Sequence, residues 1–264
     1  MKLSQVTPSI VRDTWTHSAL PVAFRPFIAD VLSDAMAGMF AMFEESLVLA
    51  RAFLTIPYRL LPPRQQAAAL TLATSVHLES LLGPSTPVLC LLASGGEIPA
   101  WNDPKSSRGH VAIPLLSDDF VASIPMISRL LKELGLPLSW VQDTGAATDR
   151  QMFGAEVGVF LVADAASALD DRGRQIIPAQ DFVAAHSVRS VFAVGGMVFG
   201  GTALILVFFS RDTLDLRTAR AFMPLVNQIK GLCIARCSVS HVFSPESAAS
   251  SGGPPGGAPR GGNP

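Results

Sequence analysis

Apolar residues recur at intervals of three and four along Phe24–Leu54, and most charged residues of this stretch fall between them. This spacing is typical of one face of an amphipathic helix and predicts a long helix over the whole range. We interpret its stripe of Met and Phe side chains as core or as a helix-pairing seam rather than as a cofactor site. A pairing seam would make the protein a homodimer held by apolar contacts, with Phe40 and Phe43 in the interface.

Two more helices follow from the same spacing and from the residues at their ends. One is predicted over Arg64–Leu81, where prolines precede it and Gly83-Pro84 ends it. The other begins at Asp118-Asp119 and runs to a C-cap at Gly135. Pro125 should kink or restart this helix, because proline lacks the backbone N–H that a helix interior requires.

The last predicted helix runs from Thr213 to about Cys237, with Asp212 as its N-cap. Cys233 and Cys237 lie one turn apart on this helix. No third or fourth ligand stands near them in the sequence, so we expect small core residues there rather than a metal site.

Two short apolar runs, Pro87–Gly96 and Glu156–Ala163, have the length and composition of buried strands. The first of them ends in a glycine turn. Adjacent apolar strands joined by short turns imply antiparallel pairing, and helices at both ends of the chain must cover the resulting sheet. The pattern therefore predicts an α+β fold.

The stretch Val191–Phe209 admits two interpretations. It carries no charge, approaches the roughly 20 apolar residues that span a bilayer, and contains a GxxxG spacing at Gly196 and Gly200. However, the pairs Gly195-Gly196 and Gly200-Gly201 are unfavourable in a helix and natural in a turn, and the flanks are rich in β-branched and aromatic residues. We therefore predict two strands joined by a glycine turn rather than a membrane helix.

The composition restricts the partners and the compartment. Lys and Arg number 20, and Asp and Glu number 21, so the formal net charge of -1 attracts neither nucleic acid nor an anionic membrane. The 3 cysteines have no CxxC spacing and fit a reducing compartment. Met1–Asp13 mixes charged and polar residues and does not resemble an export signal. We therefore expect a cytoplasmic protein that binds no nucleic acid and does not insert into membranes.

Common catalytic motifs are absent from the sequence. It contains no GxSxG, no GxxxxGK[ST], no GxGxxG after a strand, no HExxH, and no HxE with a downstream CxxC. An enzyme would have to assemble its site from distant residues such as Cys90, His110 and Asp181. We therefore expect no enzymatic activity, and we assign no catalytic or metal-binding residue.

The loop Gly96–Pro114 holds the densest group of polar and aromatic residues. We identify four candidate ligand-binding residues in it: Trp101, Asn102, Arg108 and His110. A flat aromatic anchor beside several hydrogen-bonding groups is typical of a concave binding site. The alternative is an ordered surface loop in which Asn102 makes a turn and Trp101 covers the edge of the core.

Two long segments resemble blocks of a known family. The first, Gly96–Leu136, reads GEIPAWNDPKSSRGHVAIPLLSDDFVASIPMISRLLKELGL, and the second, Ile177–Arg211, reads IPAQDFVAAHSVRSVFAVGGMVFGGTALILVFFSR. Both are similar to GAF-like sensory domains of bacterial signalling proteins, and the resemblance covers roughly Pro87–Cys237. Such domains commonly stand ahead of histidine kinase or nucleotide cyclase modules. The resemblance implies a central antiparallel sheet of about six strands, flanked by helices that often form a dimer interface.

The resemblance also suggests how the chain is organised. We expect an N-terminal helical extension over residues 1–83, a GAF-like domain over 84–240 and a disordered Gly/Pro-rich tail over 241–264. Residues 141–158 match no part of the family. Because only the tail follows Cys237, we expect a sensory or regulatory module without its own output domain. Such a module would bind a small molecule or a signalling partner, and would act on a separate protein of the kinase or cyclase type.

The resemblance leaves the ligand open. The residues that hold bilin, haem or cyclic nucleotide in better-known GAF domains have no clear counterparts here, so no cofactor is implied. A dimerisation or scaffold module, with a pocket filled by Phe160, Phe192 and Phe208, is the alternative to a ligand-binding one. A cavity large enough for a ligand would distinguish the two.

Overall fold

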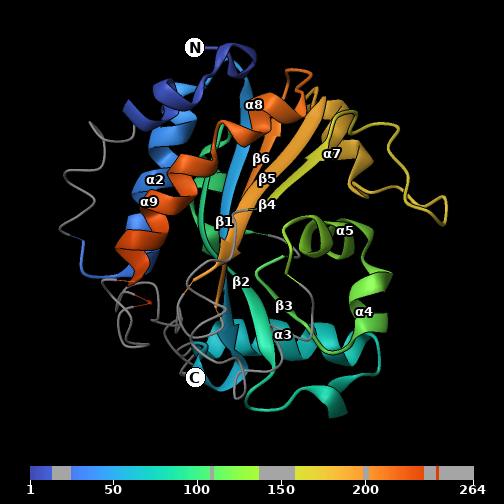
Figure 1. The fold of residues 1–264 in the computed structure, drawn as a ribbon. Helices are drawn as coiled ribbons and strands as arrows, with labels where there is room; N and C mark the ends of the chain where they lie inside the picture. Colours follow the sequence, from blue (N-terminus) through green and yellow to red (C-terminus); the bar gives the residue numbers. More distant parts are fainter. Residues whose placement is uncertain (14–24, 108–109, 137–157, 199–201, 235–241, 244–264) are drawn as a thin grey trace, which may run out of the picture.

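A six-stranded antiparallel sheet with the strand order β3-β2-β1-β6-β5-β4 forms the centre of the molecule (Figure 1). The computed structural model describes residues 1–13, 25–107, 110–136, 158–198, 202–234 and 242–243. The strands are β1 (Leu47–Pro57), β2 (Pro87–Gly96), β3 (Ala112–Pro114), β4 (Gly158–Val162), β5 (Ser190–Met197) and β6 (Ala203–Ser210). The expected α+β fold, with a central antiparallel sheet of about six strands flanked by helices, is confirmed.

Helices cover both faces of this sheet. On one face, α2 (Ile28–Met42) and α9 (Met223–Ile234) share a core with β1, β5 and β6 (Figure 1). On the other face, α4 (Asp118–Ser123) and α5 (Pro125–Glu133) close a second core. The remaining helices and 3-10 turns are α3 (Pro63–Ser75), α7 (Gln180–Ala185), α8 (Leu216–Arg220), η1 (Leu3–Gln5), η2 (Tyr58–Leu60), η3 (Glu79–Leu81), η4 (Pro99–Asn102) and η5 (Pro104–Ser106).

The helix expected over Phe24–Leu54 is wrong beyond Met42. There α2 ends, and after a short turn the chain enters β1, which pairs with β2 on one side and β6 on the other. Nearly every residue of β1 is buried, on both faces of the sheet. A strand of this kind is apolar at almost every position, so its sequence fits helical spacing as well. The domain boundary that we expected between residues 83 and 84 lies between β1 and the two strands that pair with it, β2 and β6.

The apolar stripe of α2 is part of the core. Val31, Leu32 and Met36 are fully buried in the cluster that α2 forms with the sheet and α9. Phe43, just after the helix, is also fully buried, with its ring 5.8 Å from the ring of Phe222. Most of the side chains that we considered for a pairing seam are therefore buried against other parts of the same chain.

The uncharged stretch Val191–Phe209 forms the predicted hairpin of β5 and β6. Gly195 and Gly196 do not make its turn, because β5 continues to Met197, and residues 199–201 lie outside the described part of the chain. A Cβ at Gly195 would lie 2.6 Å from the carbonyl oxygen of Leu204. Gly195 is thus a strand glycine at a close backbone approach. Among the described residues, no helix is long and apolar enough to cross a membrane.

Prolines and residues with a left-handed backbone conformation determine where several helices begin or end. Pro125 restarts the helix as expected, with α5 following α4 after a single residue, and Gly135 after α5 has a φ of 67°. However, α3 ends at Ser75 rather than Leu81, since the left-handed backbone of His77, with a φ of 57°, cannot continue a right-handed helix.

The C-terminal helix also begins later than expected and is divided in two, α8 and α9. Its N-cap is Asp215, whose carboxylate accepts a hydrogen bond of 2.8 Å from the backbone N–H of Thr218. Asp212 instead accepts a hydrogen bond of 2.7 Å from the hydroxyl of Ser46 and so joins the two turns at this end of the sheet. Cys233 is a buried core residue, as expected, and Cys237 lies outside the described residues.

Candidate functional site

A cavity of about 270 Å³ lies between the sheet and the helices α5 and α7. Leu49 and Phe53 of β1 and Phe209 of β6 contribute to its floor, and Ile127 and Leu130 of α5 form one wall. These lining side chains are apolar, and a mostly apolar concave site with few polar groups is typical of small-molecule binding. The alternation of side chains along β1 places every second residue of this strand on the cavity face.

Two of the four candidate residues from the sequence line this cavity. Trp101, at the end of η4, packs with its edge toward two neighbours, the ring of Phe182 at 5.6 Å and the ring of His186 at 4.8 Å. His110, just before β3, also lines the cavity but is exposed to solvent. Arg108 lies outside the described residues.

Asn102, the fourth candidate, is not among the residues that line the cavity. Its side-chain oxygen accepts a hydrogen bond of 2.7 Å from the backbone N–H of Gly96, the last residue of β2. A Cβ on Gly96 would lie only 2.9 Å from the indole of Trp101. Asn102 therefore positions the turn that places Trp101 over the end of β2.

Arg51 of β1 is the polar lining residue that the sequence analysis missed. Its Nε is buried without a hydrogen-bond partner, and no hydrogen bond or ion pair joins its guanidinium to another described residue. Burial lowers the pKa of Arg51, because the charged form loses hydration. The available signal was a single cation within the apolar run LVLARAFLTIP, but helical spacing placed it on a solvated face.

His110 carries less charge than Arg51 near neutral pH. Although part of the residue is exposed to solvent, neighbouring protein atoms crowd its ring, and this loss of hydration is the first cause that lowers its pKa from 6.5; the positive charge of Arg51 is the second. The imidazole is therefore mainly neutral at pH 7. No acidic side chain is among the described residues that line the cavity, so Arg51 dominates its charge.

An ion-paired group fixes the wall that carries Trp101. Glu97, next to the end of β2, binds Arg211 through one carboxylate oxygen and His186 through the other, at 2.5 Å from Nδ1. Burial alone would raise the pKa of Glu97, but the hydrogen bonds and charges of Arg211 and His186 outweigh it and lower that pKa. Since the His186 ring contacts Trp101, Glu97 connects this wall to the ends of β2 and β6.

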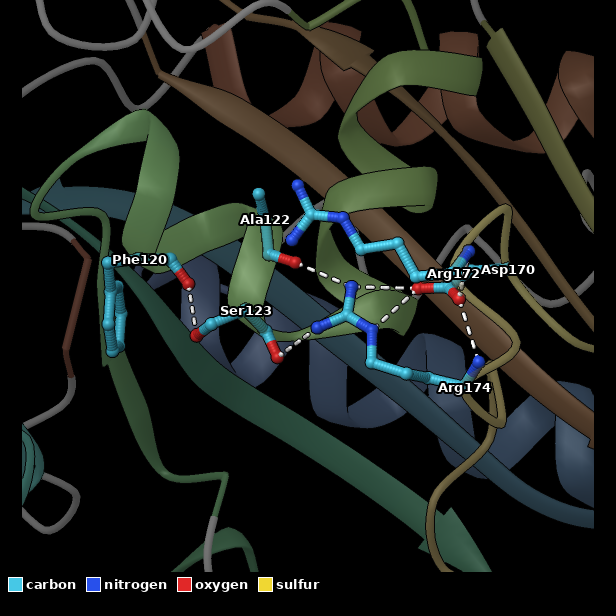
Figure 2. Close-up of polar contacts among 6 residues, drawn as sticks. All are labelled: Phe120, Ala122, Ser123, Asp170, Arg172 and Arg174. Carbon is cyan, nitrogen blue, oxygen red and sulfur yellow. Dashed lines mark hydrogen bonds and ion pairs between the residues drawn. The ribbon is translucent and has the colours of Figure 1, made fainter.

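A second polar group anchors the α4–α5 corner. Figure 2 shows Arg174 between Asp170 and the end of α4. Its guanidinium donates to the carbonyl oxygens of Ala122 at 2.8 Å and Ser123 at 3.2 Å, and its Nε donates to Asp170 at 2.8 Å. These bonds satisfy carbonyls at the C-terminal end of α4, which has no further turn to pair with them. They fix the connection between α4 and α5, and α5 forms part of the cavity wall.

The residues that an enzyme could have combined are not brought together. Cys90 lies in the core on the α2 face of the sheet, whereas His110 lines the cavity on the opposite face, and Asp181 is exposed on α7. Burial raises the pKa of the Cys90 thiol to about 12, so it is not a thiolate at neutral pH. Within the described ranges, no group of three His, Cys, Asp or Glu side chains could hold a metal ion.

The three phenylalanines that could have filled a pocket do not line this cavity. Phe192 and Phe208 stack at 4.8 Å in the core on the α2 face. Phe160 packs in the other core, with the guanidinium of Arg129 5.6 Å from its ring centre. These three residues therefore do not fill the cavity.

No protein-family model matches the sequence, and no curated protein aligns with it significantly. Among solved structures, the chain is similar to the phycoerythrobilin-bound GAF domain from a cyanobacterial phytochrome, with 11% identity and a TM-score of 0.44 over 88% of this chain and 97% of that one. The phycocyanobilin-bound GAF domain from a cyanobacterial phytochrome is similar at 10% identity and a TM-score of 0.44, over 88% and 96% of the two chains. A likeness at this level assigns neither a family nor a ligand to this chain.

Proposed function

We propose that this protein is a non-enzymatic regulatory module and that its ligand, a small molecule, occupies the cavity between β1, α5 and α7. The observation that carries the proposal is the open, mostly apolar cavity of about 270 Å³ beside the core on the α5 face of the sheet. Apolar surface in contact with water is unfavourable, so a ligand that covers the lining of an apolar hollow of this size gains free energy.

Ligand binding at this position can change the protein surface. A molecule in the cavity would contact the sheet, α5, α7 and the Trp101 turn at once, and so favour the state in which these elements are closed together. A partner that recognises the outer surface of α5 or α7 would then sense whether the cavity is occupied. The module would thus transmit binding without performing chemistry.

We expect 2-naphthamide, a flat and uncharged probe, to bind the protein in calorimetry, and Ala179→Trp to weaken that binding at least tenfold. Ala179 lines the cavity at the start of α7, and an indole there would occupy the space of the probe. Ala185→Trp is the matched control, because Ala185 is exposed like Ala179 but lies at the other end of α7 and does not line the cavity. Its affinity should stay within about twofold of the unmodified protein. Absence of binding, or equal affinity in the Ala179→Trp variant, would contradict the proposal.

We further propose that the module acts on a separate signalling protein of the kinase or cyclase type and that it does so as a homodimer. The resemblance of Gly96–Leu136 and Ile177–Arg211 to domains found ahead of such modules supports this proposal. Light scattering of the purified protein should give twice the mass of the chain. A monomer at micromolar concentration would contradict the dimer and leave the proposed ligand site unaffected.

A further inference from the structure

We propose that the cavity selects flat apolar molecules with a single carboxylate and that Arg51 binds this carboxylate. The inference rests on the proposed function, because it names the chemical class of the ligand for the same cavity. Nothing else among its described lining residues carries a permanent charge.

The geometry of Arg51 suits a carboxylate. Its Nε is buried and unpartnered, and the side chain lines the cavity. Its two Nη atoms are not buried in this way, and the N–H groups at the outer end of a guanidinium lie side by side, at the spacing of the two oxygens of a carboxylate, so they can bind both oxygens. A guanidinium that is partly withdrawn from water and has no acceptor among the described residues is costly, so a carboxylate that reaches its Nη–H groups gains more than the same contact would give in water.

The described part of the chain supplies no counter-ion for this cation. No Asp or Glu is among the described residues of the cavity lining. Glu97 is near Trp101 but is already bound by Arg211 and His186. Ser94 lies opposite Arg51 in the β1–β2 register, and its buried hydroxyl also lacks a partner. An anionic ligand would neutralise a positive charge that is otherwise left partly desolvated.

The same surroundings limit the ligand to one negative charge on an apolar body. Arg51 is the only lysine or arginine among the described lining residues, and His110 is mainly neutral at pH 7, so a second ligand charge would meet no further fixed cation there. The aromatic side chains of Trp101, Phe182 and Phe209 line the remaining space and favour a flat ring, which they can contact edge-to-face or by offset stacking.

Calorimetry with three matched probes tests the inference: 2-naphthoate, its neutral amide 2-naphthamide, and the dianionic 2-naphthyl phosphate. The unmodified protein should bind 2-naphthoate at least tenfold more tightly than either of the others, since a hydrogen bond to a charged group contributes more than the 1.4 kcal/mol that corresponds to a tenfold change. Arg51→Met should abolish this preference and leave the 2-naphthamide affinity within about twofold.

Two further variants show whether an effect of Arg51→Met is specific to the guanidinium in the cavity. Arg59→Met removes an exposed arginine outside the cavity and should leave all three affinities unchanged. Arg51→Lys keeps the charge but not the forked donors, so it should retain only part of the preference for 2-naphthoate. It replaces Arg51→Met in the comparison if that variant does not fold. The unfolding temperature of each variant, measured by circular dichroism, establishes that it is folded.

The outcomes separate this inference from the proposed function. Equal binding of 2-naphthoate and 2-naphthamide, or a preference that survives Arg51→Met, overturns the role of Arg51 while the cavity still binds apolar ligands. Tighter binding of 2-naphthyl phosphate overturns the restriction to a single carboxylate. Binding of none of the probes overturns both the inference and the proposed function.

Discussion

Gly158→Ala is expected to lower the free energy of unfolding by about 3 kcal/mol, and chemical denaturation followed by circular dichroism would measure the loss. A Cβ at Gly158 would lie 2.3 Å from the Cα of Leu134 and 2.6 Å from its carbonyl carbon and oxygen. These are backbone atoms at the end of α5, and they cannot rotate away as a side chain can. The sheet and α5 would have to separate, which should also weaken ligand binding, because α5 forms a cavity wall.

Gly38→Ala is the matched control for this prediction. Gly38 is within α2, and nothing lies within 4 Å of the position that its Cβ would occupy. The change should therefore raise the free energy of unfolding by about 0.5–1 kcal/mol, the usual difference between glycine and alanine inside a helix. A loss below about 1 kcal/mol in Gly158→Ala would show that Leu134 does not approach β4 so closely.

Phe43→Asp is expected to prevent folding, with a loss of more than about 5 kcal/mol that is comparable to the whole stability of a typical domain. Phe43 is fully buried against Phe222, whose ring lies 5.0 Å from Phe192 and 5.5 Å from Phe208. The substitution removes one ring from this cluster and places a carboxylate among the others without a partner. Far-ultraviolet circular dichroism should show no cooperative unfolding transition.

Ala37→Asp introduces the same charge at an exposed position of α2 and should change the stability by no more than about 0.5 kcal/mol. If Phe43 were instead in a pairing seam, Phe43→Asp would give a folded monomer with a normal thermal transition. Light scattering and circular dichroism on the same sample distinguish a folded monomer from an unfolded chain.

Most strands and helix breaks could be predicted from the sequence, because the signals are local. The uninterrupted apolar run Pro87–Gly96 is β2, and Pro125 separates α4 from α5. The strand β1 could not be predicted from spacing alone, because burial on both faces makes it apolar throughout. Similarly, Gly195 was assigned to a turn, whereas its function is to allow a close backbone approach that depends on a distant segment.

The candidate site was predicted only in part, for a related reason. Trp101 and His110 belong to a loop whose unusual composition marked it, and both line the cavity. Arg51 was overlooked because its importance depends on which strand it occupies and on the lack of an acidic side chain among the described residues that line the cavity. Asn102 was selected for hydrogen bonding, and its observed bond to the Gly96 backbone N–H is within the protein.

The central claim is that an apolar carboxylate occupies the cavity and binds Arg51, and a crystal structure of the protein grown with 2-naphthoate tests it most directly. The expected result is a naphthyl ring among Trp101, Phe182 and Phe209, with the carboxylate oxygens at about 2.7–2.9 Å from the two Nη atoms of Arg51. An empty cavity with Arg51 paired to a protein carboxylate, or 2-naphthoate bound only elsewhere, would contradict the claim.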